Sequence, residues 1–426
     1  MFKKSLFIHL FLILLIISGC SPRNSGDQIS CYLDIENGND ADHGTIREPI
    51  KTIEELERRL LEQPMSIYLK GRQTFFGTLH IKNANGTVAE PFIISSWGKG
   101  RATINGGKNE ALRIEDCSNL IISDLKMKGN GRKNGNSANG LALIRTVRSR
   151  VLNLRAEGFQ KSGVDLYDCR EVEVRSVKAL NNGFCGINVM GSARERSGKI
   201  VIKDCNAENN AGDPTILDNH SGNGILVGVS DSVVIERCTA TNNGWDMPRE
   251  GNGPVGIWAW ESNNIRIRYC MSYYNKTPRN AKDGGGFDLD GGVTNSIIEY
   301  CISLGNEGAG YGLFQYGGAS NWSGNIVRYC MSIGDATTTE GSGSVFIWNG
   351  SRDRTQLTDC KIYRNIFINS SAPLVSFEND SEHENFIFNK NIFIGIGDGI
   401  SGHNTGSRFG DNIWIGRFKN KPSGKE

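Results

Sequence analysis

Five segments between residues 201 and 330 share one pattern, in which a short β-favouring run ends in cysteine. They are Val201-Ile-Lys-Asp-Cys205, Val234-Ile-Glu-Arg-Cys238, Arg266-Ile-Arg-Tyr-Cys270, Ile297-Ile-Glu-Tyr-Cys301 and Ile326-Val-Arg-Tyr-Cys330. Successive cysteines lie 33, 32, 31 and 29 residues apart. Self-similarity with a period of about 20–50 residues is typical of a solenoid, and these units hold short strands without a helix.

The column of cysteines continues in both directions. Upstream, Leu125, Leu154 and Val177 stand at the same position, and downstream Asn365 and Asn391 do. A parallel β-helix accounts for such a column, because each coil pairs with the next and buries one face. The sequence therefore predicts an all-β fold, a single right-handed parallel β-helix with about 10–12 coils and a length on the order of 50 Å.

A helical pattern interrupts the strands only near the N-terminus. Thr52-Ile-Glu-Glu55 has the form of a capping box, and Ile53, Leu56 and Leu60 follow at helical spacing. We expect a short amphipathic helix over residues 52–62 that covers the open N-terminal end of the sheets. The β-helix domain is expected to extend over residues 31–426.

The first residues have the pattern of a secretory signal. Lys3 and Lys4 precede an apolar run, residues 6–17, that is too short to span a bilayer. The run closes on Ile17-Ser-Gly-Cys20, which resembles the bacterial lipobox. We expect a signal peptide over residues 1–19, lipidation of Cys20, and a polar tether over residues 20–30. The protein would then be lipid-anchored in a bacterial cell envelope, outside the cytoplasm.

Charge and cysteine usage exclude some partners. A formal net charge of +2 gives no electrostatic case for nucleic acid. Of the 11 cysteines, ten follow Cys20, and five of these share one repeat position, where stacked side chains point the same way. We therefore expect a column of small buried apolar groups. No CxxC motif or Cys/His cluster indicates a metal site.

Three central runs share a second pattern, namely Gly256-Ile-Trp-Ala-Trp260, Gly286-Phe-Asp-Leu-Asp290 and Gly312-Leu-Phe-Gln-Tyr316. Strand side chains alternate between faces. One set therefore points outward together: Trp258, Trp260, Asp288, Asp290, Phe314 and Tyr316. If the three strands stack in this order, two carboxylates lie between two pairs of aromatic rings, opposite Phe314 and Tyr316 on one side.

The outward row extends to neighbouring coils and adds Asp165, Asn188 and Trp348. An aromatic row of this size is typical of a binding surface, and flat rings suit the C–H faces of sugars. Long loops at residues 209–224, 243–255 and 275–285 precede these strands. Their charged residues include His220, Arg249, Lys282 and Asp283. They are expected to form one wall of a cleft, the alternative being that they fold over the face and bury it.

Asp288 and Asp290 are the strongest catalytic candidates, with Asp283 as a third. Two residues apart on a strand, their Cβ atoms lie about 6.5–7 Å from one another. That spacing is compatible with acid/base work on a glycosidic bond. The flanking glycines favour close approach of a ligand to the backbone. A calcium site at Asp288 and Asp290 is the competing interpretation, since hard cations bind clustered carboxylates.

The lipobox, the Gly38-Asn-Asp40 opening with its helix and the Asn/Cys coils resemble right-handed parallel β-helix proteins of bacterial polysaccharide breakdown, the pectate-lyase-like superfamily. Within that group, Gly285-Gly-Phe-Asp-Leu-Asp290 resembles the Asp-Gly-Phe-x-x-Lys stretch of family-nine pectate lyases, whose lysine is the Brønsted base. Asp290 stands where that lysine would be, and Gly285 replaces the aspartate. The aspartates fit better with β-helix glycoside hydrolases, which work with clusters of aspartates.

These observations predict a monomeric carbohydrate-active enzyme without a cofactor that acts on a polysaccharide or oligosaccharide. A glycoside hydrolase is the first expectation. A polysaccharide lyase is the second, with calcium and with Lys276, Arg279 or Lys282 as its base. A non-catalytic glycan-binding rod is the third. The substrate-binding residues would be Trp258, Trp260, Phe314, Tyr316, Asp165, Asn188, Trp348, Arg249, Lys282 and His220.

Overall fold

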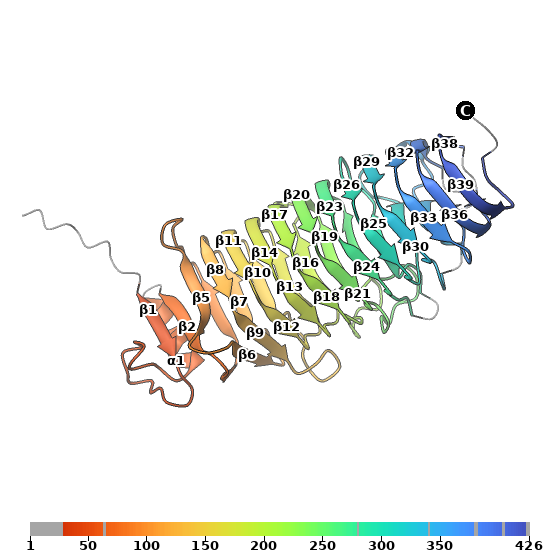
Figure 1. Cartoon of the computed structure of the whole chain (residues 1–426). Helices are drawn as coiled ribbons and strands as arrows, with labels where there is room; N and C mark the ends of the chain where they lie inside the picture. The colour runs from red at the N-terminus through yellow and green to blue at the C-terminus, as the bar shows by residue number, and fades with distance from the viewer. Residues whose placement is uncertain are drawn as a thin grey trace, which may run out of the picture.

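The computed structural model describes residues 29–62, 65–278, 281–339, 341–378, 382–402 and 405–422. Their strands stack into a rod with the N-terminal coil at one end and the C-terminal coil at the other (Figure 1). Each coil passes in turn through three parallel sheets, and consecutive coils pair in register. The predicted all-β, single parallel β-helix is confirmed.

The first sheet has 14 strands among the described residues. In spatial order they are β1 (Ser30–Leu33), β2 (Ser66–Lys70), β5 (Phe92–Trp97), β8 (Leu120–Ser123), β11 (Val147–Leu152), β14 (Arg170–Arg175), β17 (Ser197–Lys203), β20 (Ser230–Glu236), β23 (Asn263–Arg268), β26 (Ile297–Glu299), β29 (Trp322–Arg328), β32 (Leu357–Tyr363), β35 (Glu384–Asn389) and β38 (Ser407–Gly410).

The second sheet has 13 described strands. They are β3 (Thr74–Phe76), β6 (Ala102–Gly107), β9 (Leu125–Gly129), β12 (Arg155–Glu157), β15 (Lys178–Leu180), β18 (Asn206–Glu208), β21 (Thr239–Thr241), β24 (Met271–Tyr273), β27 (Ile302–Leu304), β30 (Met331–Ile333), β33 (Ile366–Asn369), β36 (Ile392–Gly397) and β39 (Ile413–Phe418).

The third sheet, which we call the site sheet, has 12 described strands. They are β4 (Leu79–Lys82), β7 (Leu112–Glu115), β10 (Leu141–Ile144), β13 (Ser162–Tyr167), β16 (Cys185–Met190), β19 (Asn223–Gly228), β22 (Val255–Trp260), β25 (Gly285–Leu289), β28 (Tyr311–Gln315), β31 (Val345–Asn349), β34 (Val375–Phe377) and β37 (Ile400–Ser401). The 12 to 14 described strands in each sheet put the number of coils at or just above the upper end of the expected 10–12.

The cysteine column lies inside the rod, at the turn from the first sheet to the second. All ten cysteines from Cys31 to Cys360 are buried and free of disulfides, as expected of small apolar groups. The column passes to asparagine where the sequence predicts it, because the Cys330 N–H donates to Asn365 Oδ1 at 2.9 Å and the Asn365 N–H to Asn391 Oδ1 at 3.0 Å.

A second ladder runs through the turn between the second sheet and the site sheet. Each buried asparagine amide donates to the side-chain oxygen of the next coil at 2.8–3.0 Å. The members are Asn182, Asn210, Asn243, Asn275, Asn306 and, at its end, Asp335. Because every member satisfies a buried backbone N–H as well, this asparagine ladder fixes the entry into the site strands.

The N-terminal end is closed by α1 (Ile53–Glu62), close to the predicted range 52–62. Thr52 caps the helix, because its hydroxyl accepts the Glu55 N–H at 3.2 Å, and Leu56 is fully buried. A single 3-10 turn, η1 (Arg354–Gln356), precedes β32. Within the described residues, neither helix is long and apolar enough to cross a membrane. Residues 1–28, and with them Cys20, lie outside the described residues.

Candidate active site

The candidate site lies on the outward face of four neighbouring site-sheet strands, β22, β25, β28 and β31, in the green-to-blue part of the rod (Figure 1). Parallel pairing places one outward residue of each strand in a row. Trp258 pairs with Asp288, Asp288 with Gly312, and Gly312 with Phe346. The central aspartate of this row therefore has an indole on one side and a glycine on the other.

The expected pairing of Phe314 with Asp288 is wrong by two residues, since Gly312 holds that place. The reason is Tyr311, which occupies an inward position. Its ring stacks on Phe287 at 5.4 Å between centroids, and its hydroxyl lies 3.0 and 2.9 Å from two core carbonyl oxygens. A tyrosine is tolerated in the core because its hydroxyl is satisfied there. Phe314 is thereby brought level with Asp290 instead.

Three aspartates form what we call the aspartate trio: Asp283 in the loop before β25, Asp288 within β25, and Asp290 directly after it. Asp288 is 3% exposed and the other two are half-buried. Asp283 Oδ2 accepts the Gly253 N–H at 2.7 Å, and Asp290 Oδ1 accepts the Gly291 N–H at 2.7 Å. Asp288 Oδ1 is buried and has no hydrogen-bond partner among the described residues.

The environment of the trio raises all three pKa values. Burial raises the pKa of Asp290 to about 7, and the charge of Asp283 adds to the effect. Burial likewise raises the pKa of Asp283 to about 6, against the opposing charges of Lys282 and Arg249. The pKa of Asp288 lies well above its usual range, because the carboxyl is buried and faces the other two. Near neutral pH the trio therefore holds both protonated and ionised carboxyls.

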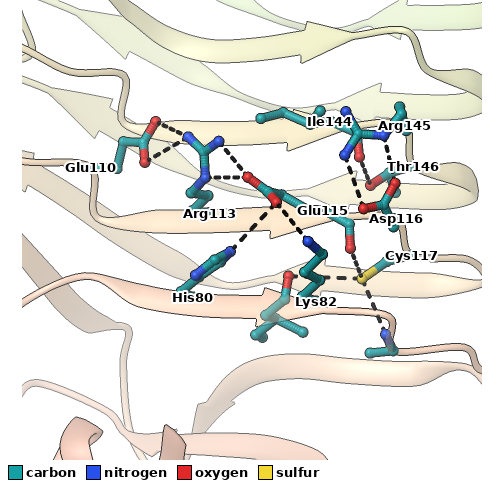
Figure 2. Close-up of polar contacts among 12 residues, drawn as sticks. His80, Lys82, Glu110, Arg113, Glu115, Asp116, Cys117, Ile144, Arg145 and Thr146 are labelled. Carbon is teal, nitrogen blue, oxygen red and sulfur yellow. Dashed lines mark hydrogen bonds and ion pairs between the residues drawn. The ribbon is translucent and has the colours of Figure 1, made fainter.

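No ion pair offsets this charge, because none of the described cations pairs with any of the three carboxylates. The N-terminal part of the same sheet face is different. There Glu115 lies beside Arg113, with Lys82 Nζ at 3.8 Å and His80 Nε2 at 3.9 Å, and Arg113 also contacts Glu110 at 3.1 Å (Figure 2). The charges at that end neutralise one another. Carboxylates without an ion pair are thus a feature of the central coils that the N-terminal coils do not share.

The indole of Trp258 is buried, at 4% exposure, rather than open to solvent. His220, from the loop before β19, lies edge-on against the indole with 4.7 Å between the ring centroids. The Nε1–H of Trp258 donates to Asn223 Oδ1 at 3.0 Å. Burial and the charge of Arg249 lower the pKa of His220 to about 4, so the imidazole is neutral at pH 7. The alternative expectation, that a loop folds over the face, holds for this ring.

Two of the other aromatic rings, those of Trp260 and Phe314, lie against glycines. Trp260 is half-buried and crosses Gly228, where an added Cβ would lie 2.5 Å from its Nε1. Phe314 is 8% exposed and covers Gly312, where a Cβ would meet the ring at 2.7 Å and Asp288 Oδ1 at 3.1 Å. Tyr316 is half-buried. Only a glycine at position 312 leaves room for both the carboxyl and the ring above it.

Trp348 lies next to Phe314 with a centroid distance of 6.3 Å and is half-buried, at the C-terminal side of the trio. At the other side, Asn188 Nδ2 donates to Asp165 Oδ1 at 2.7 Å. Burial raises the pKa of Asp165 to about 6. Asp165 and Asn188 share the outward row with Asp288 but are separated from it by the strands β19 and β22. They are a second polar position on the face, apart from the trio.

The cationic loop candidates divide into three groups. Arg249 and Lys282 lie close enough to the trio to act on the pKa of Asp283. Lys276 pairs with Glu307 at 3.5 Å, facing the next coil. Arg279 lies outside the described residues.

Glu261, which the sequence reading missed, belongs to the site. Its carboxylate accepts the Ser320 N–H at 2.7 Å and raises the pKa values of Tyr316 and Asp290. It follows Trp260 directly, at a left-handed turn with φ 44°. Such a corner residue breaks the strand alternation, so the pattern does not predict its direction. The sequence signal that could have indicated Glu261 is an acidic residue directly after the outward aromatic residue Trp260.

Within the described part of the chain, no group of three or more His, Cys, Asp or Glu side chains is arranged to hold a metal ion. Calcium at the two residues Asp288 and Asp290 stays a prediction. Two surface pockets of about 320 and 440 Å³ lie away from the trio, one beside α1 and one beside Tyr329.

Comparison with known proteins identifies the fold. The family described as "Right handed beta helix region" matches residues 214–361. A search of curated proteins gave no match. Among solved structures, the GH136 lacto-N-biosidase from Eubacterium ramulus is similar with a TM-score of 0.65 and 17% identity, over 86% of this chain and 68% of that one.

Two further structures are similar at lower scores. A mannuronic-acid-specific family 6 polysaccharide lyase from human gut microbiota has a TM-score of 0.52 and 14% identity, over 82% of this chain and 80% of that one. The Dettilon tailspike protein has a TM-score of 0.55 and 12% identity, over 85% and 64%. The chain therefore has the right-handed parallel β-helix fold that these proteins share.

Proposed function

We propose that this right-handed β-helix is a carbohydrate-active enzyme, and specifically a glycoside hydrolase that uses the aspartate trio. One observation carries the proposal: three carboxyls that form no ion pair with a described cation, with pKa values raised to about 6 and 7 at two of them, stand on a face that also carries aromatic rings. Hydrolysis of a glycosidic bond needs one protonated and one ionised carboxyl at the same pH, and this environment supplies both.

The roles follow from exposure and pKa. Asp290 is half-buried and has the pKa of about 7, so it is the general acid that gives its proton to the leaving glycosidic oxygen. Asp283, with a pKa of about 6, is ionised and takes a proton from the attacking water. Water's oxygen bonds to the anomeric carbon as the glycosidic C–O bond breaks. Asp288 is 3% exposed and its own pKa is raised by burial and by the charges of Asp290 and Asp283, so it is a buried, protonated neighbour of the acid/base pair and not the group that contacts substrate.

The substrate is expected along the rod, where the half-buried rings of Trp260, Tyr316 and Trp348 flank the trio. Flat rings with exposed edges suit sugars, and the shared fold of the lacto-N-biosidase supports a hydrolase of oligosaccharides. Arg249, Lys282 and the neutral His220 are proposed to line the loop side, while Asp165 and Asn188 bind a more distant part of the chain.

The test is a screen of the purified protein against neutral and acidic polysaccharides and oligosaccharides, with and without chelator, followed by single variants. Asp290→Asn and Asp283→Asn should each lower kcat by at least about 10²-fold with the fold intact. Asp411→Asn is the matched control, an exposed aspartate at a turn that accepts asparagine equally well. New reducing ends without an unsaturated product support hydrolysis. Near-normal turnover in both trio variants would remove the assignment.

A polysaccharide lyase is the second candidate. It is favoured by the shared fold of the mannuronic-acid-specific lyase and by Lys282, an exposed base beside the trio that has no ion pair among the described residues. It predicts an unsaturated product that absorbs in the ultraviolet, loss of activity with Lys282→Ala and sensitivity to chelator. A non-catalytic binder predicts glycan binding without any turnover.

We further propose that Cys20 is lipidated and that the β-helix acts as a monomer outside the cytoplasm, tethered to a bacterial envelope membrane. The lipobox-like Ile17-Ser-Gly-Cys20 supports this, since only a cysteine can form the thioether.

A further inference from the structure

A different edge of the rod, at the turn from the first sheet to the second, carries an unusual column. The residue just before each cysteine-column position has a left-handed backbone, with φ between 52° and 57°. Asparagine and aspartate tolerate this conformation, whereas bulky side chains rarely adopt it. The column reads Asp124, Asn153, Ser176, Asp204, Arg237, Tyr269, Tyr300, Tyr329, Arg364, Lys390 and Asp411. Large residues thus occupy six consecutive coils.

Three successive members, which we call the tyrosine stack, are Tyr269, Tyr300 and Tyr329. Their ring centroids lie 5.1 and 5.0 Å apart, with planes within 9° and 3° of parallel. Tyr269 and Tyr300 are 52% and 43% exposed. The faces of the rings are largely covered by one another, so the stack presents ring edges and hydroxyls to solvent in a line along the rod.

The stack ends at a pocket. Tyr363 lies 6.2 Å from Tyr329 with its ring turned by 71°, and a pocket of about 440 Å³ opens there. Its walls are Tyr329, Lys361, Tyr363, Arg364, Ile387, Asn389 and Lys390. The lining combines two aromatic rings, an amide and three cations, and it contains no acid.

The cations of this pocket are available to a ligand. None of Lys361, Arg364 and Lys390 forms an ion pair with another described residue. Arg364 Nη1 donates to Tyr329 Oη at 2.6 Å, which holds the guanidinium 5.6 Å from that ring. Asn389 also lines the pocket, but its Oδ1 is buried and closed to a ligand. The three cations are therefore the polar groups that this pocket offers to a ligand.

We propose that this pocket, with the tyrosine stack leading to it, is a second and non-catalytic binding site for an anionic saccharide, one that bears carboxylate or sulfate groups. Lys361, Arg364 and Lys390 bind the anion, and Tyr363 supplies the apolar wall for a sugar ring. The site lies on another edge of the rod than the aspartate trio, and it does not depend on the proposed hydrolase activity.

A saccharide fits this surface better than a nucleic acid. The rings of the stack are closed against one another, so no base can insert between them, and the overall charge of +2 supplies no extended basic groove. An anionic saccharide instead offers carboxylate or sulfate groups to the three cations and a ring to Tyr363, all within the pocket.

The experiment measures binding by calorimetry with the full mature chain carrying Asp290→Asn, so that turnover cannot intervene. The probes are oligogalacturonate, a sulfated carrageenan oligosaccharide, a neutral malto-oligosaccharide of equal length and single-stranded oligothymidylate. We expect the acidic saccharides to bind, with affinity that falls as salt is added. Lys361→Ala/Lys390→Ala and Tyr363→Ala should each weaken binding by about tenfold or more. Binding of one acidic probe but not the other identifies whether carboxylate or sulfate is recognised.

Two controls separate binding from a merely structural stack. Tyr269→Asn removes one ring from the far end and relieves its left-handed backbone, and should leave binding at the pocket within about twofold. Lys178→Ala, an exposed lysine on β15, controls for net charge. No binding of either acidic saccharide, equal binding of the neutral one, tighter binding of oligothymidylate, or unchanged binding in the double lysine variant would each overturn the proposal. Loss of hydrolase activity by itself does not bear on it.

Discussion

Replacement of Asp290 by asparagine should make the protein more stable at alkaline pH while it removes activity. Folding raises the pKa of this carboxyl from an ordinary value of 3.8 to about 7. Between these values the folded protein holds a proton that the unfolded chain has released. The free energy of unfolding therefore falls as pH rises from about 4 to about 7, and stays reduced above pH 7.

The magnitude follows from the shift. Roughly 3 pKa units at about 1.36 kcal/mol each give an upper bound of about 4 kcal/mol at pH 8. An unfolding entropy of about 2.1 cal/mol/K per residue over about 400 residues is about 0.8 kcal/mol/K, so this gain corresponds to a rise in Tm of about 5 °C. At pH 4 the carboxyl is protonated in the folded state and already partly protonated in the unfolded chain, so the difference shrinks to about 0.6 kcal/mol and Asp290→Asn should change Tm by about 1 °C or less.

The assay is thermal unfolding by circular dichroism at pH 4 and pH 8 for the parent, Asp290→Asn and the control Asp411→Asn. The expected result is stabilisation by Asp290→Asn at pH 8 only, with the control unchanged at both. If Asp290→Asn gives the same shift at both pH values, or destabilises at pH 8, the raised pKa and the acid role built on it are wrong.

Three further predictions follow. The profile of kcat/KM against pH should be bell-shaped with limbs near 6 and 7, since Asp283 must be ionised and Asp290 protonated. Asp283→Asn should remove the acidic limb, and an unchanged acidic limb would contradict the role of Asp283 as base. Gly312→Ala should lower kcat by about tenfold or more, because its Cβ would lie 2.7 Å from the Phe314 ring; Gly317→Ala, where a Cβ would make only an ordinary 3.5 Å contact with the Gly350 carbonyl, is the control for thermal stability. Cys20→Ala should move the protein from the membrane fraction to the soluble fraction, and unchanged fractionation refutes lipidation.

The fold was predictable because its information is periodic. A cysteine at one position of five successive coils, an asparagine after the strand in most coils and a capping box at the N-terminal helix each report one local requirement, and these requirements agree with one another. The structure adds the register of individual strands. Alignment on glycines paired Phe314 with Asp288, whereas an inward Tyr311 shifts β28 by two residues. Hydrophobic alternation cannot predict that a tyrosine points inward, because that depends on its hydroxyl donating to carbonyl oxygens in the core.

The site was predictable only in part. Alternation placed Asp288 outward, as the register of β25 has it. Exposure was not predictable, because it depends on how the loops fold. The imidazole of His220 covers Trp258, and the buried amide of Asn223 anchors that indole. Neither contact is part of the repeat, since His220 and Asn223 both belong to the long segment 209–224 of a single coil. Whether Trp258 binds sugar directly remains a prediction.

The fold explains why the trio keeps its raised pKa values. Isolated carboxylates relieve repulsion by moving apart, and here the backbone prevents it. Asp288 sits on a strand paired in parallel on both sides, and the asparagine ladder fixes the entry to that strand through Asn275 and Asn306. Lys282 and Arg249 act only on Asp283, and none of the described cations forms an ion pair with the trio. Proton uptake therefore lowers the repulsion, and a carboxyl held in this way is protonated where an ordinary one has already ionised. The proposed general acid, Asp290, thus depends on a stiff solenoid that keeps buried carboxyls close together.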